Sequence, residues 1–142
     1  MTIYADSSFF VSLHLIDRYS PEAWDRMSRR PAVWISALNR AEFTHAVFQH
    51  VFWRKATVSE AENAIAGLDR DCRAGVWREA GFPDLAFMRS SDLARRYGPA
   101  LGVRTLDSLH VACALELKAE RFWTFDERQA RLAEAVGLNT SL

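Results

Sequence analysis

The chain has 142 residues, which suits one domain and leaves little room for two. Hydrophobic residues make up 49% of it and charged residues 25%, the balance of an ordinary globular protein. The 18 basic and 18 acidic side chains cancel, so the total charge does not indicate a nucleic-acid partner, although a local basic patch is enough for one.

Three further features bear on the compartment. No apolar run reaches the length of a membrane span, since Asp6, His14 and Asp17 interrupt the first candidate. The N-terminus lacks a basic region followed by an apolar core, so we expect a cytoplasmic protein with no membrane partner. Cys72 and Cys113 are the only cysteines, and we expect free thiols and no zinc site.

The first half of the chain alternates between strand-like and helix-like segments. Short apolar β-favouring runs predict strands, and Asp, Ser or Asn before an apolar-periodic run predicts a helix start. Pro21 is expected to open the second helix, with Trp24 and Met27 on its inner side, and Pro31 to end it. The predicted elements are a strand at Thr2–Ala5, helices at 9–16 and 21–30, a strand at Ala32–Ile35, and helices at Ala37–Lys55 and Ser59–Arg73.

The second half continues the alternation. Residues 75–83 are predicted as a loop or short strand, and residues 84–97 as a helix broken by Gly98, Pro99 and Gly102. In that helix the predicted inner positions are Leu85, Met88, Leu93 and Tyr97. Further elements are a helix at Thr105–Ala119, a strand at Arg121–Phe125, a helix at Glu127–Ala135 capped by Gly137, and a last short strand at Leu138–Thr140.

Alternating strands and helices predict an α/β fold over residues 1–142 as a single domain, with a mostly parallel central sheet of about four to five strands flanked by helices. Helices dominate the residue count. In open parallel sheets, ligands bind outside the carboxyl ends of the strands. Residues that directly follow the strands are therefore the first candidates for a functional site.

Four carboxylates lie at such places. Asp6 and Asp126 follow predicted strands, Glu42 lies early in a helix that follows a strand, and Asp107 opens an apolar helix. Each alone is explained by helix capping or the helix dipole. Together they would repel, and their pKa values would rise unless a cation compensates. Oxygen ligands suit Mg²⁺ or Mn²⁺, and such ions serve the hydrolysis of phosphate esters.

Four motifs carry a family resemblance over essentially the whole chain: YADSS at Tyr4–Ser8, SALNRAE at Ser36–Glu42, RTLDSLHVACALEL at Arg104–Leu117 and TFDERQ at Thr124–Gln129. With this order and spacing the chain resembles PIN-domain ribonucleases, specifically the VapC-type toxin of a bacterial type II toxin–antitoxin pair. The resemblance implies a three-layer sandwich and a metal-dependent endoribonuclease that dimerises and is blocked by a cognate antitoxin. It also implies that one or two Mg²⁺ or Mn²⁺ ions are held by the acidic quartet, which falls on Asp6, Glu42, Asp107 and Asp126.

Five other residues are predicted to support this site. The Ser7 hydroxyl is placed to orient a carboxylate or a metal-bound water, or to cap a helix. Thr105 is expected to cap the helix that bears Asp107, and Asn39 to contact substrate or hold the acid three residues later. His110 follows Asp107 by one helical turn, and both a structural and a catalytic role are open for it. Arg104 is the best candidate for a phosphate contact with RNA.

Two alternative functions are compared with this pattern. A catalytically silent PIN-like module that only binds RNA or protein is compatible with the same pattern, although all four acidic positions are filled. Another phosphate-handling α/β enzyme lacks its motifs. A phosphoaspartate phosphatase requires a D-x-D pattern where Asp6 is followed by Ser7 and Ser8, and no phosphate-binding glycine loop or G-x-S-x-G is present.

Overall fold

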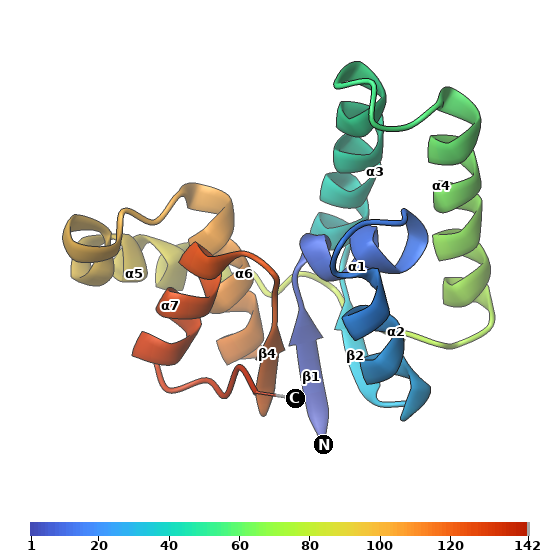
Figure 1. The fold of residues 1–142 in the computed structure, drawn as a ribbon. Helices are drawn as coiled ribbons and strands as arrows, with labels where there is room; N and C mark the ends of the chain where they lie inside the picture. Colours follow the sequence, from blue (N-terminus) through green and yellow to red (C-terminus); the bar gives the residue numbers. More distant parts are fainter. Residues whose placement is uncertain (142) are drawn as a thin grey trace.

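A four-stranded, all-parallel sheet forms the centre of the computed structural model, which describes residues 1–141 (Figure 1). The strand order β3-β2-β1-β4 places the first strand inside the sheet. Tyr4 pairs in parallel with Trp34 on one side and with Phe122 on the other. The expected α/β fold with a mostly parallel sheet is confirmed. The strands are β1 (Thr2–Ala5), β2 (Ala32–Ile35), β3 (Arg78–Glu79) and β4 (Arg121–Trp123).

Within residues 1–141 seven helices cover the sheet, α1–α4 on one face and α5–α7 on the other (Figure 1). Successive strand residues point to opposite faces. Ile3 therefore packs in one core cluster with Phe10 of α1, and Tyr4 in a second one with Val111 of α6. The helices are α1 (Ser7–His14), α2 (Ser20–Ser28), α3 (Ala37–Phe52), α4 (Val58–Arg73), α5 (Leu85–Leu101), α6 (Thr105–Glu116) and α7 (Glu127–Ala135).

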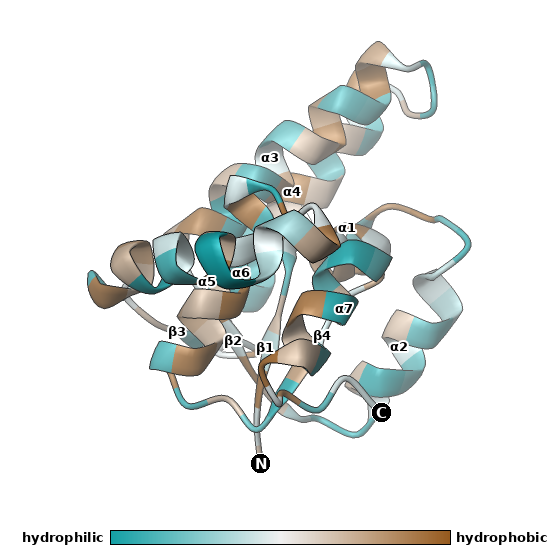
Figure 2. Cartoon of the chain, turned by 90° about the vertical axis from the view of Figure 1, so that its left-hand side faces the viewer, coloured by the Kyte–Doolittle hydropathy of each residue, from teal (hydrophilic) through white to brown (hydrophobic). Residues whose placement is uncertain are grey.

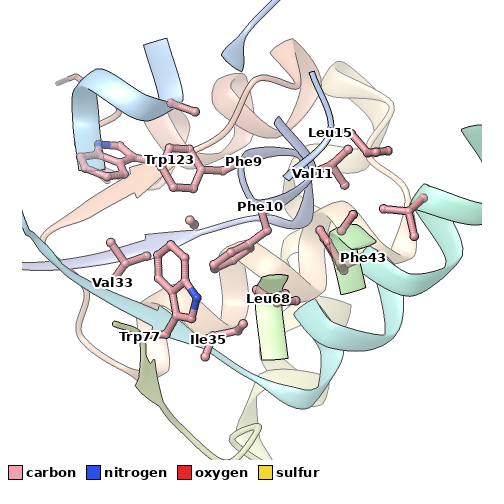
Figure 3. Packing of buried hydrophobic residues seen from close by; sticks show 14 of the residues in the cluster. Phe9, Phe10, Val11, Leu15, Val33, Ile35, Phe43, Leu68, Trp77 and Trp123 are labelled. Carbon is pink, nitrogen blue, oxygen red and sulfur yellow. The ribbon is translucent and has the colours of Figure 1, made fainter. Parts of the chain in front are cut away.

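Aromatic side chains fill the layer between the sheet and helices α1–α4 (Figure 3). Phe10 is fully buried and meets the ring of Trp77 edge-on, with 4.9 Å between ring centroids. Phe9 packs at 5.2 Å against Trp123 of β4. Edge-to-face and tilted aromatic pairs of this kind stabilise a core beyond the area they bury. They anchor α1 over the end of β1, and this fixes the junction that contains Asp6.

Helices α3 and α4 form a hairpin whose connecting end projects beyond the rest of the molecule (Figures 1 and 2). Helix α3 packs against α1 and α4, and its buried Phe43 and Val47 belong to the core cluster. Phe52, which continues the same apolar stripe in sequence, lies near the projecting end and is 79% exposed. Helical periodicity locates a stripe, but it does not tell how far along the helix the core extends.

Helix α5 continues through Gly98 and Pro99 to Leu101, so the predicted break at residues 98–99 is wrong. A proline in a helix removes one backbone donor and fixes φ near a helical value. Pro99 lies in the last turn, where only the carbonyl four residues earlier loses a partner. Packing of α5 along α6 and α7 outweighs this cost. The helix ends at Gly102, which has a φ of 63° and donates its N–H to the Gly98 carbonyl at 2.8 Å.

The inner faces of two helices differ from the prediction. Trp24 is 48% exposed, and the inner positions of α2 are Ala23 and Arg26. Leu85 and Met88 are also exposed, because α5 turns Ala86, Ser90 and Leu93 toward its neighbours. The predicted inner residues Met27, Leu93 and Tyr97 do pack against the core. Small or polar side chains take other inner positions, so hydrophobicity alone identifies only part of the buried face.

Several boundaries shift by a few residues. The predicted last strand at 138–140 is reduced to one parallel bridge between Asn139 and Arg121, and the region 75–83 contains only the two-residue strand β3. Helix α6 ends at Glu116, before the predicted Ala119, and β4 ends at Trp123. Within residues 1–141 no helix combines the length and the apolar composition that crossing a membrane requires.

Candidate active site

The four predicted carboxylates line one cleft of about 820 Å³ at the carboxyl edge of the sheet. Asp6 follows β1 and caps α1, and Asp126 caps α7 shortly after β4. Asp107 lies in the first turn of α6, and Glu42 lies on α3. Because parallel strands end at the same edge, acids 120 residues apart in the chain reach a common space. The predicted Ser7, Arg104 and Thr105 line the same cleft.

Asp6 lines the cleft and is 2% exposed. One carboxylate oxygen accepts hydrogen bonds from the Ser8 hydroxyl at 2.6 Å and the Phe9 N–H at 3.3 Å, and the other accepts from the Thr124 hydroxyl at 2.8 Å. Removal from water raises the pKa of Asp6, and these hydrogen bonds and the attraction of His110 offset only part of the rise. Asp6 is thus a rigidly held carboxylate that a nearby cation would stabilise.

Glu42 is held from two sides. The Ser7 hydroxyl donates to its Oε1 at 2.9 Å, and His110 Nε2 hydrogen bonds to the same oxygen. The other ring nitrogen of His110, Nδ1, is 2.7 Å from the buried Tyr4 hydroxyl. Burial by itself would raise the pKa of Glu42, but the hydrogen bond and charge of His110, together with Ser7, keep it below its usual value. Glu42 is therefore an anion that faces the cleft.

Arg104 joins the two remaining acids. Its Nε lies 3.2 Å from Asp107 Oδ2, and its Nη2 lies 3.8 Å from Asp126 Oδ2. Asp107 is buried, whereas the Arg104 side chain is 65% exposed. The hydrogen bond and charge of Asp107 raise the pKa of Arg104 further. This exposed guanidinium supplies positive charge between two carboxylates.

Two supporting residues have other roles than predicted. Thr105 does not cap α6, because Arg104 occupies the cap position and its backbone N–H donates to Asp107 Oδ2 at 3.1 Å. Asn39 is fully buried and does not line the cleft. Its amide donates to the Ala5 carbonyl at 3.0 Å and its carbonyl oxygen accepts from the backbone N–H of Ser36 at 2.9 Å. Asn39 thus ties the start of α3 to the end of β1.

Three site residues were missed at the sequence level. Ser8 and Thr124 hold Asp6, and Tyr4 supports the ring of His110. Ser8 and Thr124 each lie two residues from a predicted acid, and this is a usable signal, since hydroxyls near metal ligands often orient them. Tyr4 carries no such signal, because a tyrosine in a central strand is equally well explained as core packing.

The donor set is compatible with a hard divalent cation, since every candidate ligand is a carboxylate oxygen. Within residues 1–141, no three His, Cys, Asp or Glu side chains are grouped closely enough to hold a metal ion together. Mg²⁺ commonly uses only one or two carboxylates and keeps several waters, so a cage is not required. The buried Asp6, with its raised pKa, and the acids that pair with Arg104 provide the negative charge such an ion needs.

Comparison with known proteins identifies one family and several solved structures with a similar fold. The model of the PIN domain family matches residues 3–135, and no curated protein sequence matches. The VapC20 toxin of Mycobacterium tuberculosis, described as cleaving the sarcin–ricin loop, superposes with a TM-score of 0.73 at 15% identity, covering 98% of each chain. VapBC2 of Rickettsia felis, bound to a promoter DNA fragment, gives 0.65 at 15% identity, covering 99% and 98%. FitAcB of Neisseria gonorrhoeae gives 0.66 at 16%, covering 99% and 96%.

Proposed function

This chain belongs to the PIN domain family, and we propose that it is a metal-dependent endoribonuclease, the toxin of a toxin–antitoxin pair. One observation carries the proposal. Four carboxylates from four separate elements line a single open cleft at the sheet edge where such folds bind ligands. The similar structures include a VapC toxin described as cleaving the sarcin–ricin loop and a VapBC structure, and this favours a toxin nuclease here.

Asp6, Glu42, Asp107 and Asp126 are the residues that would hold one or two Mg²⁺ or Mn²⁺ ions. When bound, such an ion lowers the pKa of an attacking water and neutralises charge on the phosphodiester. The protein contributes fixed ligand geometry. Ser8 and Thr124 hold both oxygens of Asp6, so this carboxylate does not have to reorient during the reaction.

The remaining residues orient ligands and substrate. Ser7 and His110 fix the carboxylate of Glu42 on the cleft side of α3. The exposed guanidinium of Arg104 is placed to turn from Asp107 and Asp126 toward a phosphate of the RNA. Asn39 acts at a distance, by securing the helix that carries Glu42.

We further propose a cytoplasmic homodimer that binds a cognate antitoxin. The open cleft continues from the acids past apolar side chains of α1 and α3, including Val11, Ala46 and Trp53. A hydrophobic groove of this kind suits a peptide or helix of a partner protein. An antitoxin seated there would cover the acids, and this would explain inhibition by occlusion.

The test is cleavage of total cellular RNA by the purified protein with Mg²⁺, with Mn²⁺ and with EDTA. Asp6→Asn and Asp107→Asn are compared with Asp92→Asn, an exposed acid on α5 away from the cleft. We expect cuts only with metal, their loss in the first two variants, and full activity in the control. Cleavage retained by Asp107→Asn would overturn the proposal. If all folded variants and the wild type leave RNA intact but bind it, the protein is a binding module.

A further inference from the structure

A second, smaller groove of about 420 Å³ adjoins the acidic cleft. The two share four lining residues, Tyr19, Arg104, Phe125 and Asp126, so they form one continuous depression. The second groove adds Arg18, Glu127, Arg128 and Arg131, which come from the segment before α2 and from α7. Of these residues only Arg104 and Asp126 belong to the site described above.

The two parts have opposite charge. The acidic cleft is lined by five carboxylates (Asp6, Asp17, Glu42, Asp107 and Asp126) and by one arginine. The second groove is lined by four arginines and two carboxylates. A polyanion is repelled by the first and attracted by the second. A phosphodiester strand that reaches the acids is therefore best held by phosphates lying in the arginine-lined part, which we call the basic groove.

The arginines of the basic groove are available for a ligand. Within residues 1–141, neither Arg18 nor Arg128 forms an ion pair, and both are exposed. Arg131 lies 3.6 Å from Glu127, but this pair is on the surface of α7 with both side chains well exposed. Exposed pairs of this type contribute little and exchange readily for a phosphate. Only Arg104 is engaged with buried charge.

One wall of the basic groove is a stack of aligned planar groups. Phe125 stacks on the core residue Phe9 at 6.0 Å, and Tyr19 stacks on Phe125 at 4.6 Å with an interplanar angle of 7°. The guanidinium of Arg18 lies 4.5 Å from the centroid of the Tyr19 ring and donates to its hydroxyl. Arg18 is thus positioned by a column that begins in the core, so that less side-chain entropy is lost when it binds an anion.

We propose that the basic groove binds phosphates of a single-stranded RNA that flank the phosphate placed in the acidic cleft, through Arg18, Arg128 and Arg131. The inference rests on the proposed nuclease function and extends it from the reacting phosphate to the strand. These three side chains do not contact the acids that would hold metal. The backbone N–H of Arg128 does donate to Asp126 at 2.9 Å, but an alanine variant keeps this hydrogen bond. Their loss weakens binding and raises KM, and leaves kcat largely unchanged.

The experiment compares two double variants with the same loss of charge. Arg18→Ala/Arg128→Ala removes two cations of the basic groove. Arg73→Ala/Arg95→Ala removes two exposed helical arginines, on α4 and α5, that line neither groove. Binding of a short fluorescein-labelled single-stranded RNA is followed by anisotropy in EDTA over a range of salt concentrations. Melting temperatures confirm that both variants are folded.

We expect the plot of log Kd against log salt to flatten by about 0.7 for each lost phosphate contact, and so by about 1.4 for the basic-groove variant. At 0.1 M salt this corresponds to roughly 25-fold weaker binding if the lines meet at 1 M. The control should keep the wild-type slope. Equal slopes and affinities for the two double variants would overturn the inference.

The outcome is separate from that of the nuclease proposal. If the wild type cleaves RNA and the basic-groove variant binds and cleaves like the control, the groove is not part of the RNA site although the nuclease stands. If the variant loses binding while the wild type never cleaves, the groove binds RNA in a protein that is not a nuclease. Kinetics on cleaved RNA complete the test, because a change confined to kcat would contradict a role in strand binding.

Discussion

Glu42 and His110, 68 residues apart in the chain, meet through a hydrogen bond between His110 Nε2 and Glu42 Oε1. A carboxylate with a lowered pKa only accepts, so Nε2 carries the hydrogen and donates. His110 is itself fully buried, and its second nitrogen is 2.7 Å from the Tyr4 hydroxyl. The acid on α3 is therefore oriented by a side chain of α6 that is supported from the central strand.

This relationship predicts different effects for two amides at position 110. In His110→Gln the amide N–H reaches about where Nε2 lies, whereas in His110→Asn it is too short to reach Glu42. A hydrogen bond to a charged group contributes about 1.5–3 kcal/mol. We expect His110→Asn to lower the cleavage rate by about ten- to a hundredfold and to weaken Mn²⁺ binding in calorimetry. His110→Gln should keep most of the cleavage rate and of the Mn²⁺ affinity. If the two variants behave alike at equal melting temperature, His110 has only a packing role.

The ion pairs of Arg104 predict opposite effects on metal and on RNA. In Arg104→Gln the acids Asp107 and Asp126 lose a positive neighbour, and their charge becomes fully available to a cation. We expect tighter Mn²⁺ binding by calorimetry and weaker RNA binding by anisotropy, with Arg95→Gln unchanged in both. Unaltered Mn²⁺ affinity would mean that Arg104 does not compete with a metal.

His14 predicts a loss of stability in mild acid. The ring packs edge-on against Phe43 at 5.8 Å, and burial lowers its pKa, an effect that Asp71 at 3.4 Å only partly offsets. As pH falls below the usual value of 6.5, the unfolded chain takes up the proton before the folded protein does. Stability from the neutral ring is thus complete above about pH 6.5 and is lost as pH falls through the lowered pKa.

The measurement is the free energy of unfolding in urea at pH 7.5 and at pH 5.5. His14→Gln should show a smaller loss between these values than the wild type, because the titrating group is gone. The exposed His45 provides the control, and His45→Gln should follow the wild type. A wild-type loss that His14→Gln leaves unchanged would assign the acid sensitivity to other groups.

Two phenylalanines test where the core ends. Phe10 is fully buried against Trp77, and Phe10→Ala should lower the free energy of unfolding by about 3–5 kcal/mol through lost burial and a cavity. Phe52 on the projecting end of α3 is 79% exposed, and Phe52→Ala should change the free energy of unfolding by no more than about 0.5 kcal/mol. Urea denaturation measures both. A large loss for Phe52→Ala would show that its face is covered in solution by another molecule.

Local patterns predicted much of the architecture. Alternating apolar runs and caps are set by backbone geometry over a few residues, so the strands at Thr2–Ala5 and Ala32–Ile35 were predicted with the observed bounds. Parallel strands share an edge, and for that reason the positions of Asp6 and Asp126 after strands were enough to bring them together. Positions near helix starts added Glu42 and Asp107, which the same cleft contains.

Other features depended on packing between distant segments. The helix through Pro99, the exposure of Trp24 and the partners of Asp6 are set by how elements lie on one another, which short-range periodicity does not encode. The basic groove is a further case, since Arg18 and Arg128 are 110 residues apart and neither is unusual in its own segment. The sequence by itself thus determined the elements and the acids at their ends, because those follow from local geometry. Only the tertiary structure decided which side chains orient the acids and which arginines adjoin them, because these contacts join residues that the chain separates.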